Sequence, residues 1–386
     1  MTQSPNPKKS FTQALTPAAL GYRMPAEWEP HASTWIAWPH NRTDWPGKFE
    51  AIPWVYAEIV RHLGRVERVE IIVADAAEEK RARQILGKSH VELGNVRFHR
   101  WPTDRVWTRD SGPIFVRRDE GGDGKSKPAS ERVRTAGGFA SPVAITHWRF
   151  NAWAKYPDWK RDCKLPERIA KVLKLPVWRP TVALNGRRLE VVLEGGSIDV
   201  NGRGTLLTTE ECLLSSVQQR NPGLGRGDLE RVFAEFLGIR KVLWLEAGIV
   251  GDDTHGHVDD IARFVNPDTV VTVVEGNSSD QNFEILQKNL HRLQAMTDQD
   301  GRPLRVVPLP MPAPVIFRGQ RLPASYANFY IANGLVLVPT FNDPNDRVAL
   351  NTLAELFPKR RVVGIYCGDF IWGLGAIHCM TQQQPQ

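Results

Sequence analysis

The 386-residue chain has no run of about 18 apolar residues, the length that a helix needs to cross a bilayer. The segment Met1–Lys9 also lacks the apolar stretch of a secretory signal peptide. Cysteine is scarce: the chain has four, at positions 163, 212, 367 and 379, and no C-x-x-C pair for zinc or redox chemistry. The sequence therefore predicts a cytoplasmic protein with reduced thiols and no disulfide framework.

Neither sign of charge dominates, because 50 Lys and Arg stand against 43 Asp and Glu, a formal net charge of +7. A nucleic-acid binder usually gathers its basic residues into a patch. Here they are dispersed, and two small clusters, 80–83 and 359–361, lie on or beside predicted helices, as solvated faces do. We expect neither a nucleic-acid partner nor a membrane partner, while a homo-oligomer stays open.

Hydrophobic periodicity divides the chain into a tail and a repeated module. Residues 1–20 are polar and aperiodic and are predicted to form a flexible tail, and residues 21–386 a single domain. The domain begins with a strand, a helix and a strand at 35–38, 49–63 and 66–74. Four hairpins follow, predicted at 113–135, 197–208, 261–274 and 327–339.

Each hairpin is followed by a predicted helix and a further strand. In the first hairpin, strand 113–116 is predicted to return through 132–135 after a polar, Gly-rich loop at 119–131, a candidate for disorder. The helices are predicted at 166–173, 228–237, 281–296 and 346–356, and the strands after them at 180–183, 241–245, 305–309 and 362–366.

The hairpin turns recur at intervals of roughly 65 to 80 residues, which gives about five modules over the chain. We therefore expect an α/β fold in which β-β-α-β modules form a ring. An open, doubly wound sheet is the alternative, but parallel α/β folds rarely carry a hairpin in every repeat.

Residues capable of chemistry stand directly before the hairpins. They are Trp107 and Asp110 in W-T-R-D-S-G-P (107–113), Glu194 in L-E-G-G-S (193–197), and His257 and Asp259 in G-D-D-T-H-G-H-V-D-D (251–260). The chain end presents Cys379 beside His378, after a turn that contains Gly373 and Gly375. A ring brings equivalent positions to one centre, so we expect Asp110, Glu194, His257, Asp259 and Cys379 to share a pocket.

Three carboxylates, an imidazole and a thiol define an anionic pocket for a cation. A guanidinium suits it best, because paired carboxylates can each hold its planar array of N–H donors. Cys379 is then placed to attack the guanidinium carbon as a thiolate, and His257 to move protons. Because nearby carboxylates raise the pKa of a thiol, the thiolate requires the bound cation or a protonated His257.

Other interpretations of these residues stay open. Asp110 beside Arg109 is also typical of an ion pair, Glu194 of a turn, His257 of a core histidine and Cys379 of a small buried apolar residue. The run His255-x-His257-x-Asp259 also resembles a metal site of a metal-dependent hydrolase, since alternate residues of a strand can bind one ion. That site would leave Cys379 and Glu194 without a role.

Taken together, the motifs resemble the agmatine deiminase and bacterial peptidylarginine deiminase family. Further matches are M-P-A-E-W-E-P-H (24–31), F-N-A-W (150–153), A-S-Y-A-N-F-Y-I-A-N-G (324–334) and I-H-C-M-T-Q-Q-Q-P (377–385). The resemblance implies the five-bladed, pseudo-symmetric α/β propeller (pentein) of the guanidine-modifying superfamily, built of ββαβ repeats. It also implies no metal or organic cofactor, and hydrolysis of agmatine to N-carbamoylputrescine and ammonia through a covalent amidino-thioether.

By motif, the resemblance implies these roles: Cys379 as nucleophile, His257 as general acid and base, Asp110 and Asp259 as the guanidinium-binding pair, Glu194 as a further substrate-binding carboxylate and Trp107 as a wall. Two positions depart from the usual motifs, because Ala154-Lys155 replaces Gly-Gly and Ala376 replaces an asparagine. Peptidyl-arginine or free arginine as substrate, or an amidinotransferase reaction, therefore remain alternatives. Agmatine is preferred over arginine because no motif supplies a cation for an α-carboxylate except Arg109, which is expected to face away.

Overall fold

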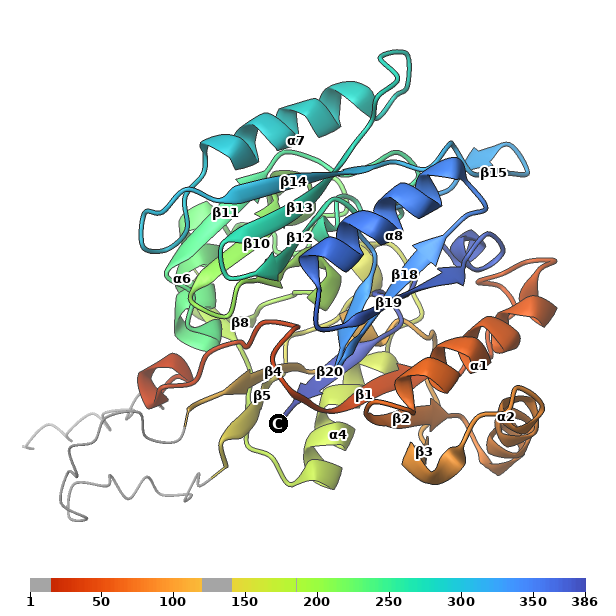
Figure 1. Ribbon diagram of the computed structural model, residues 1–386. Helices are drawn as coiled ribbons and strands as arrows, with labels where there is room; N and C mark the ends of the chain where they lie inside the picture. The colour runs from red at the N-terminus through yellow and green to blue at the C-terminus, as the bar shows by residue number, and fades with distance from the viewer. Residues whose placement is uncertain (1–14, 120–140, 185) are drawn as a thin grey trace, which may run out of the picture.

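The computed structural model describes residues 15–119, 141–184 and 186–386. Most of the predicted tail (1–20) and of the predicted Gly-rich loop (119–131) lies outside them. The described residues form a mixed α/β fold with five sheets of three or four strands and two short ribbons (Figure 1). No helix in this part of the chain is long and apolar enough to cross a membrane.

One sheet contains both the first and the last strand of the described residues. Its strands, in the order β20-β1-β2-β3, are β20 (Gln382–Pro385), β1 (His31–Ala37), β2 (Arg68–Val73) and β3 (Val96–Arg100). Helices α1 (Ile52–Leu63) and α2 (Ala76–Lys88) connect its three parallel strands. Because β20 pairs antiparallel with β1, the residues just before β20 are held beside the first strand of the fold.

The other four sheets repeat one pattern, in which the first two strands are antiparallel and the third is parallel to the second. They are β4 (Ile114–Arg117), β5 (Val143–Thr146) and β6 (Val177–Trp178); β9 (Asp199–Val200), β10 (Thr205–Thr209) and β11 (Lys241–Leu245); β12 (Ala262–Asn266), β13 (Thr269–Val274) and β14 (Arg305–Pro310); and β17 (Tyr330–Ala332), β18 (Leu335–Thr340) and β19 (Arg361–Tyr366). The predicted β-β-α-β module is confirmed.

A helix fills the long connection of each module. These helices are α4 (Leu165–Leu173), α6 (Arg226–Leu237), α7 (Phe283–Ala295) and α8 (Pro344–Leu356). The start of α8 follows from its sequence, since Asp343 caps the helix, Pro344 occupies its first position, and Asp346 accepts a hydrogen bond from the Asp343 N–H. Figure 1 shows α1, α6 and α7 toward the outside of the molecule, with strands between them.

The first hairpin differs from the prediction. The predicted return strand, 132–135, lies outside the described residues, and β4 pairs instead with β5 (Val143–Thr146). All four residues of β5 are buried, so the strand is selected by apolar burial rather than by closeness to β4 in the sequence. Strand β7 (Thr181–Leu184), predicted to complete this module, pairs only with β8 (Arg187–Glu190) in an exposed ribbon, and β6 takes its place.

A buried ion network centred on Glu27 joins four parts of the chain. The Glu27 carboxylate accepts hydrogen bonds from Arg109 (3.1 Å) and from the backbone N–H of Ile331 (2.8 Å). Arg263 in β12 and His378 also contact it, at 2.9 and 2.8 Å. Burial acts to raise the pKa of Glu27, but the charges of Arg263, His378 and Arg109 outweigh it and hold the pKa well below its usual range.

We expect Arg263→Met to lower the free energy of unfolding by about 3–5 kcal/mol, because it leaves the buried carboxylates of Glu27 and Asp199 without their shared cation. Arg231→Met is the matched control, since it removes an exposed arginine whose pair with Asp228 contributes about 0–1 kcal/mol. Urea unfolding of both variants measures the difference. Equal losses would contradict a structural role for this network.

Candidate active site

A cavity of about 300 Å³ opens beside Cys379. Three of the residues predicted from sequence line it, namely Trp107, Asp110 and Cys379. Gly373 and Gly375 of the predicted turn before Cys379 also line it, and the rest of the lining comes from residues that carried no prediction of a role: Thr43, Asp44, Arg105, Trp153, Tyr156, Asp253, Thr254 and Leu374. Of the five residues predicted to share a pocket, Asp110 and Cys379 line this cavity, whereas Glu194, His257 and Asp259 are buried and are not among its lining residues.

Cys379 stands just before β20, with 6% of its surface exposed. Its Sγ lies 3.8 Å from Asp259 Oδ2 and accepts a hydrogen bond from Asn328 Nδ2 at 3.1 Å. Burial and the nearby carboxylates, Asp259 foremost, raise the pKa of the thiol well above its usual value. The resting group is thus a thiol rather than a thiolate at neutral pH, and only an added cation or proton donor nearby reverses that.

The turn before Cys379 requires a glycine at position 375. A Cβ there would lie 2.8 Å from the Trp107 ring and 3.1 Å from the Cys379 Cβ. Trp107 is itself fixed, because its ring packs against Trp45 and Phe370 at centroid distances of 5.6 and 6.2 Å. The aromatic packing therefore holds both the cavity wall and the backbone that presents the thiol.

His257 lies among three carboxylates. Its Nδ1 is 3.8 Å from Asp110 Oδ1 and 4.0 Å from Asp259 Oδ1, and its Nε2 is 3.7 Å from Glu194 Oε2. Burial lowers the pKa of His257, but the Asp110 charge and contacts with Cys212 and Glu194 outweigh burial and raise it well above its ordinary value. The ring is therefore an imidazolium at neutral pH and can act as a proton donor.

Asp110 sits in the one-turn helix α3 (Thr108–Ser111) rather than on a strand. Its Oδ2 accepts a hydrogen bond from Trp153 Nε1 (2.9 Å), and its Oδ1 accepts one from the backbone N–H of Gly196 (3.0 Å). Burial, with the charges of the other carboxylates, raises its pKa to about 6. A Cβ on Gly196 would approach His257 Nδ1 to 2.6 Å, which explains the glycine in this motif.

Glu194 is fully buried and is not among the residues that line the cavity. Its Oε1 accepts a hydrogen bond from Arg220 Nε at 3.2 Å, and its Oε2 faces His257. Burial acts to raise the pKa of Glu194, yet Arg220 and His257 lower it to about 2. This carboxylate is thus ionised at neutral pH, and it faces Nε2 of His257, the ring nitrogen opposite the one that faces Asp110.

Asp259 is held by His378. The Nδ1 of His378 lies 2.7 Å from Asp259 Oδ2, and its Nε2 lies 2.8 Å from Glu27 Oε2. The His378 contact outweighs burial and lowers the pKa of Asp259, which keeps the carboxylate ionised. Its other oxygen, Oδ1, has no hydrogen-bond partner among the described residues and is free to accept a donor.

Arg109 faces away from the cavity, as the sequence predicted. Its guanidinium donates to Gln383 Oε1 (2.7 Å) and to Glu27 (3.1 Å) in the ion network. Sequence reasoning missed other cations near the cavity, however. Arg105 lines it, and Lys155 pairs with Asp253, another lining residue.

Several contacts at the site depend on residues far apart in the chain and had no separate signal. Trp153 and Asn328 lay inside motifs noted from the sequence, but their bonds to Asp110 and Cys379 were not anticipated. Ala152, Trp153 and Ala154 all have positive φ angles of 50–58°, an unusual run that turns the Trp153 indole toward Asp110.

The metal triad considered from the sequence is not assembled. His255 contacts Ser215 Oγ (3.2 Å) and Glu211 (3.7 Å) rather than joining His257 and Asp259. Over the described ranges, two groups have ligand atoms close enough for one ion: Glu194 with Cys212 and His257, and Asp259 with Asp260 and Cys379. The strand alternation that suggested the triad is absent, because 258–260 form a turn of 3-10 helix.

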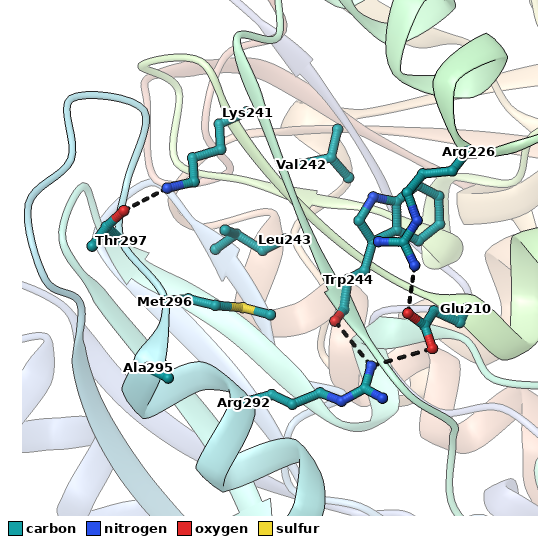
Figure 2. Close-up of a pocket in the computed structure, with 10 residues that line it drawn as sticks. All are labelled: Glu210, Arg226, Lys241, Val242, Leu243, Trp244, Arg292, Ala295, Met296 and Thr297. Atoms are coloured by element: carbon teal, nitrogen blue, oxygen red, sulfur yellow. Dashed lines mark hydrogen bonds and ion pairs between the residues drawn. The ribbon is translucent and has the colours of Figure 1, made fainter.

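A larger surface cavity, of about 480 Å³, lies beside β11 and α7 (Figure 2). It contains no thiol and no imidazole. Its cations already have partners, since Arg226 and Arg292 both contact Glu210 and Lys241 donates to Thr297. The chemistry therefore belongs to the smaller cavity beside Cys379.

A family model and two curated proteins match nearly the whole chain. The model of the Porphyromonas-type peptidyl-arginine deiminase family matches residues 23–385. The agmatine deiminase of Pseudomonas aeruginosa (strain LESB58) is 34% identical over 96% of this chain and 97% of its own. The agmatine deiminase of Medicago truncatula is 35% identical over 96% and 98%.

Solved structures agree with these relatives. An agmatine deiminase of Enterococcus faecalis has a TM-score of 0.83 and 30% identity, over 97% of this chain and 98% of its own. A putative arginine deiminase from Porphyromonas gingivalis has a TM-score of 0.78 and 33% identity, over 95% and 98%. The matched range includes every strand of the five sheets and every residue of the site, and the chain belongs to the Porphyromonas-type peptidyl-arginine deiminase family.

Proposed function

We propose that this protein is an agmatine deiminase, which hydrolyses agmatine to N-carbamoylputrescine and ammonia through an amidino-thioether on Cys379. The observation that carries the proposal is the position of the Cys379 thiol, which opens on the same cavity as Asp110 and lies 3.8 Å from Asp259. The curated relatives named agmatine deiminase support the choice of substrate.

Asp110 and Asp259 bind the guanidinium in this proposal. Both are buried, and Asp259 has an oxygen without a partner among the described residues, so the N–H donors of the substrate satisfy an acceptor that is otherwise costly to bury. The bound cation also offsets the carboxylates that raise the pKa of Cys379. Substrate binding therefore favours the thiolate, and the site is reactive mainly when occupied.

The reaction then has two halves. With the cation bound, the Cys379 thiol releases its proton to solvent, and the thiolate sulfur forms a bond to the guanidinium carbon as a C–N π bond of the guanidinium opens. His257, an imidazolium at rest, gives its proton to the departing nitrogen, and the C–N bond breaks to release ammonia. Neutral His257 next takes a proton from water, whose oxygen attacks the amidino carbon. The C–S bond then breaks, Cys379 leaves as the thiolate, and the ureido product gives its remaining extra proton to solvent. Glu194 and Trp107 contribute indirectly, by holding His257 and the cavity wall.

We propose in addition that the five sheets are the blades of a five-bladed, pseudo-symmetric α/β propeller (pentein), with 21–386 as its single catalytic domain. Support comes from the shared strand pattern of four sheets and from the fifth, which pairs the first strand with the last. Asp110, Glu194, His257 and Cys379 each precede the first strand of a different sheet. A cytoplasmic location, the lack of nucleic-acid or membrane partners and the lack of a cofactor remain predictions, and the oligomeric state stays open.

Free arginine is the second candidate substrate, because Arg105 lines the cavity and offers a cation for an α-carboxylate. The guanidinium of Arg105 is already bound to Asp44 (2.7 Å) and Asp158 (3.2 Å). Both terminal nitrogens of this guanidinium, Nη1 and Nη2, therefore have carboxylate partners, and the α-carboxylate of a bound free arginine must compete with them. This competition favours agmatine.

Cys379→Ser is expected to reduce agmatine turnover by at least about a thousandfold while agmatine still binds, since a hydroxyl without a strong base is a poor nucleophile and the carboxylates remain. Ammonia release measures turnover, and calorimetry measures binding. Cys163→Ser, which changes a thiol outside the cavity, should leave both near wild type. A serine variant at position 379 with wild-type turnover would end the assignment.

For wild type, kcat/KM for agmatine should fall as the pH drops below about 6, because the raised pKa of Asp110 makes this carboxyl neutral there and it no longer attracts the guanidinium. Trp153→Phe removes a hydrogen bond that favours the charged form, so the same inflection should move to higher pH. A profile that stays flat to about pH 5, or an unmoved inflection in the variant, would contradict this role of Asp110.

A further inference from the structure

The cavity beside Cys379 is also lined by charged and polar side chains that include Asp44, Arg105, Tyr156 and Asp253; we call them the outer end because two of their ion-pair partners, Asp158 and Lys155, are 40% exposed. We propose that Asp44 forms a binding site for a primary ammonium at the far end of the guanidine substrate. The inference rests on the proposed function and adds to it the residue that selects an amine-bearing substrate.

Two carboxylates of the outer end line the cavity, and they differ in what they can still accept. Both oxygens of Asp253 are engaged, one by the Lys155 ammonium and the other by the Tyr156 hydroxyl at 2.6 Å. Asp44 Oδ1 accepts a hydrogen bond from Arg105 Nη1, but Asp44 Oδ2 has no partner among the residues that the structure describes. The Asp44 side chain is 2% exposed, so this oxygen lacks bulk water as well.

A buried carboxylate oxygen without a hydrogen bond costs free energy that a donor from the substrate recovers. An ammonium is the donor that recovers most, because it supplies a charge as well as an N–H group. Burial raises the pKa of Asp44 to about 6 even though Arg105 opposes the shift, and a bound cation would favour the ionised form further. Arg105 therefore pairs with only one oxygen of Asp44, and the other oxygen can accept a second cationic donor.

The sign of the local charge supports an ammonium over a carboxylate. Three carboxylates at this end, Asp44, Asp158 and Asp253, face two cations, Arg105 and Lys155, which leaves one negative charge in excess. The Arg105 guanidinium also lies 4.2 Å from the centre of the Tyr156 ring, which further occupies it. The Nε–H of Arg105 has no acceptor among the described residues and could donate to a carboxylate, so the test also includes free arginine.

The test compares agmatine with butylguanidine, which has the same guanidinium but a methyl group in place of the aminomethyl end. Wild type should prefer agmatine by at least about thirtyfold in kcat/KM, the size of one charge-assisted contact. In Asp44→Asn the preference should fall to within about threefold, with kcat/KM for butylguanidine nearly unchanged. Asp253→Asn, the matched control, should keep the wild-type preference, because its carboxylate is already paired.

A measurement on wild type alone makes the test independent of how the variants fold. The ratio of kcat/KM for the two substrates should decline as the pH falls below about 6, where Asp44 becomes neutral. Protonation of Asp110 affects the guanidinium of both substrates equally and so cancels in the ratio.

Three outcomes would overturn the inference. An Asp44→Asn variant that keeps the agmatine preference, while wild type hydrolyses both guanidines, would remove Asp44 from the site and leave the proposed function intact. A wild-type preference for free arginine over agmatine would assign the outer end to Arg105 instead. Failure of wild type to hydrolyse any of the three guanidines would overturn the proposed function itself, and this site with it.

Discussion

The buried carboxylate of Glu27 is the contact on which the arrangement of the site depends. It joins Arg109, Arg263 and His378, which come from three different parts of the chain. His378 then contacts Asp259 through its other nitrogen, so a single chain of contacts runs from the centre of the fold to the carboxylate beside Cys379. Removing charge from this network is costly in a dry interior, and that cost fixes the geometry of the residues next to the thiol.

The carboxylates of the site have different pKa values because each lies in a different environment. Glu194 forms an ion pair with Arg220 and stays ionised. Asp110 accepts hydrogen bonds only from neutral groups, and its pKa is about 6. His257 lies among these carboxylates and is held protonated by them. Such opposed shifts among close titratable groups are a usual feature of sites that move protons. Here they leave the thiol of Cys379 protonated until a cation arrives, which couples reactivity to substrate binding.

Sequence patterns predicted the features of the fold that depend on neighbouring residues, namely turns, helices and the strands of short hairpins. The hairpins predicted at 197–208 and 327–339 are both present, and each contains an Asn-Gly pair, at 201–202 and 333–334, a sequence that favours a tight turn between strands. The pairing of β4 with β5 was not predictable, because a strand chosen by burial gives no signal of its distant partner. The same limit applies to Arg220 against Glu194 and to Trp153 against Asp110, contacts made by side chains 26 and 43 residues apart. The alternative metal site at 255–259 is not assembled for a local reason, since the backbone at 258–260 is a turn of 3-10 helix.

The central claim is that Cys379 becomes covalently attached to the substrate. It is tested most directly by quenching wild type in acid during agmatine turnover and locating modified cysteines by peptide mass spectrometry. The account predicts an amidino adduct on the peptide that contains Cys379 and none on those that contain Cys163, Cys212 or Cys367. An adduct on another cysteine, or turnover with no adduct at any time point while ammonia accumulates, would contradict it.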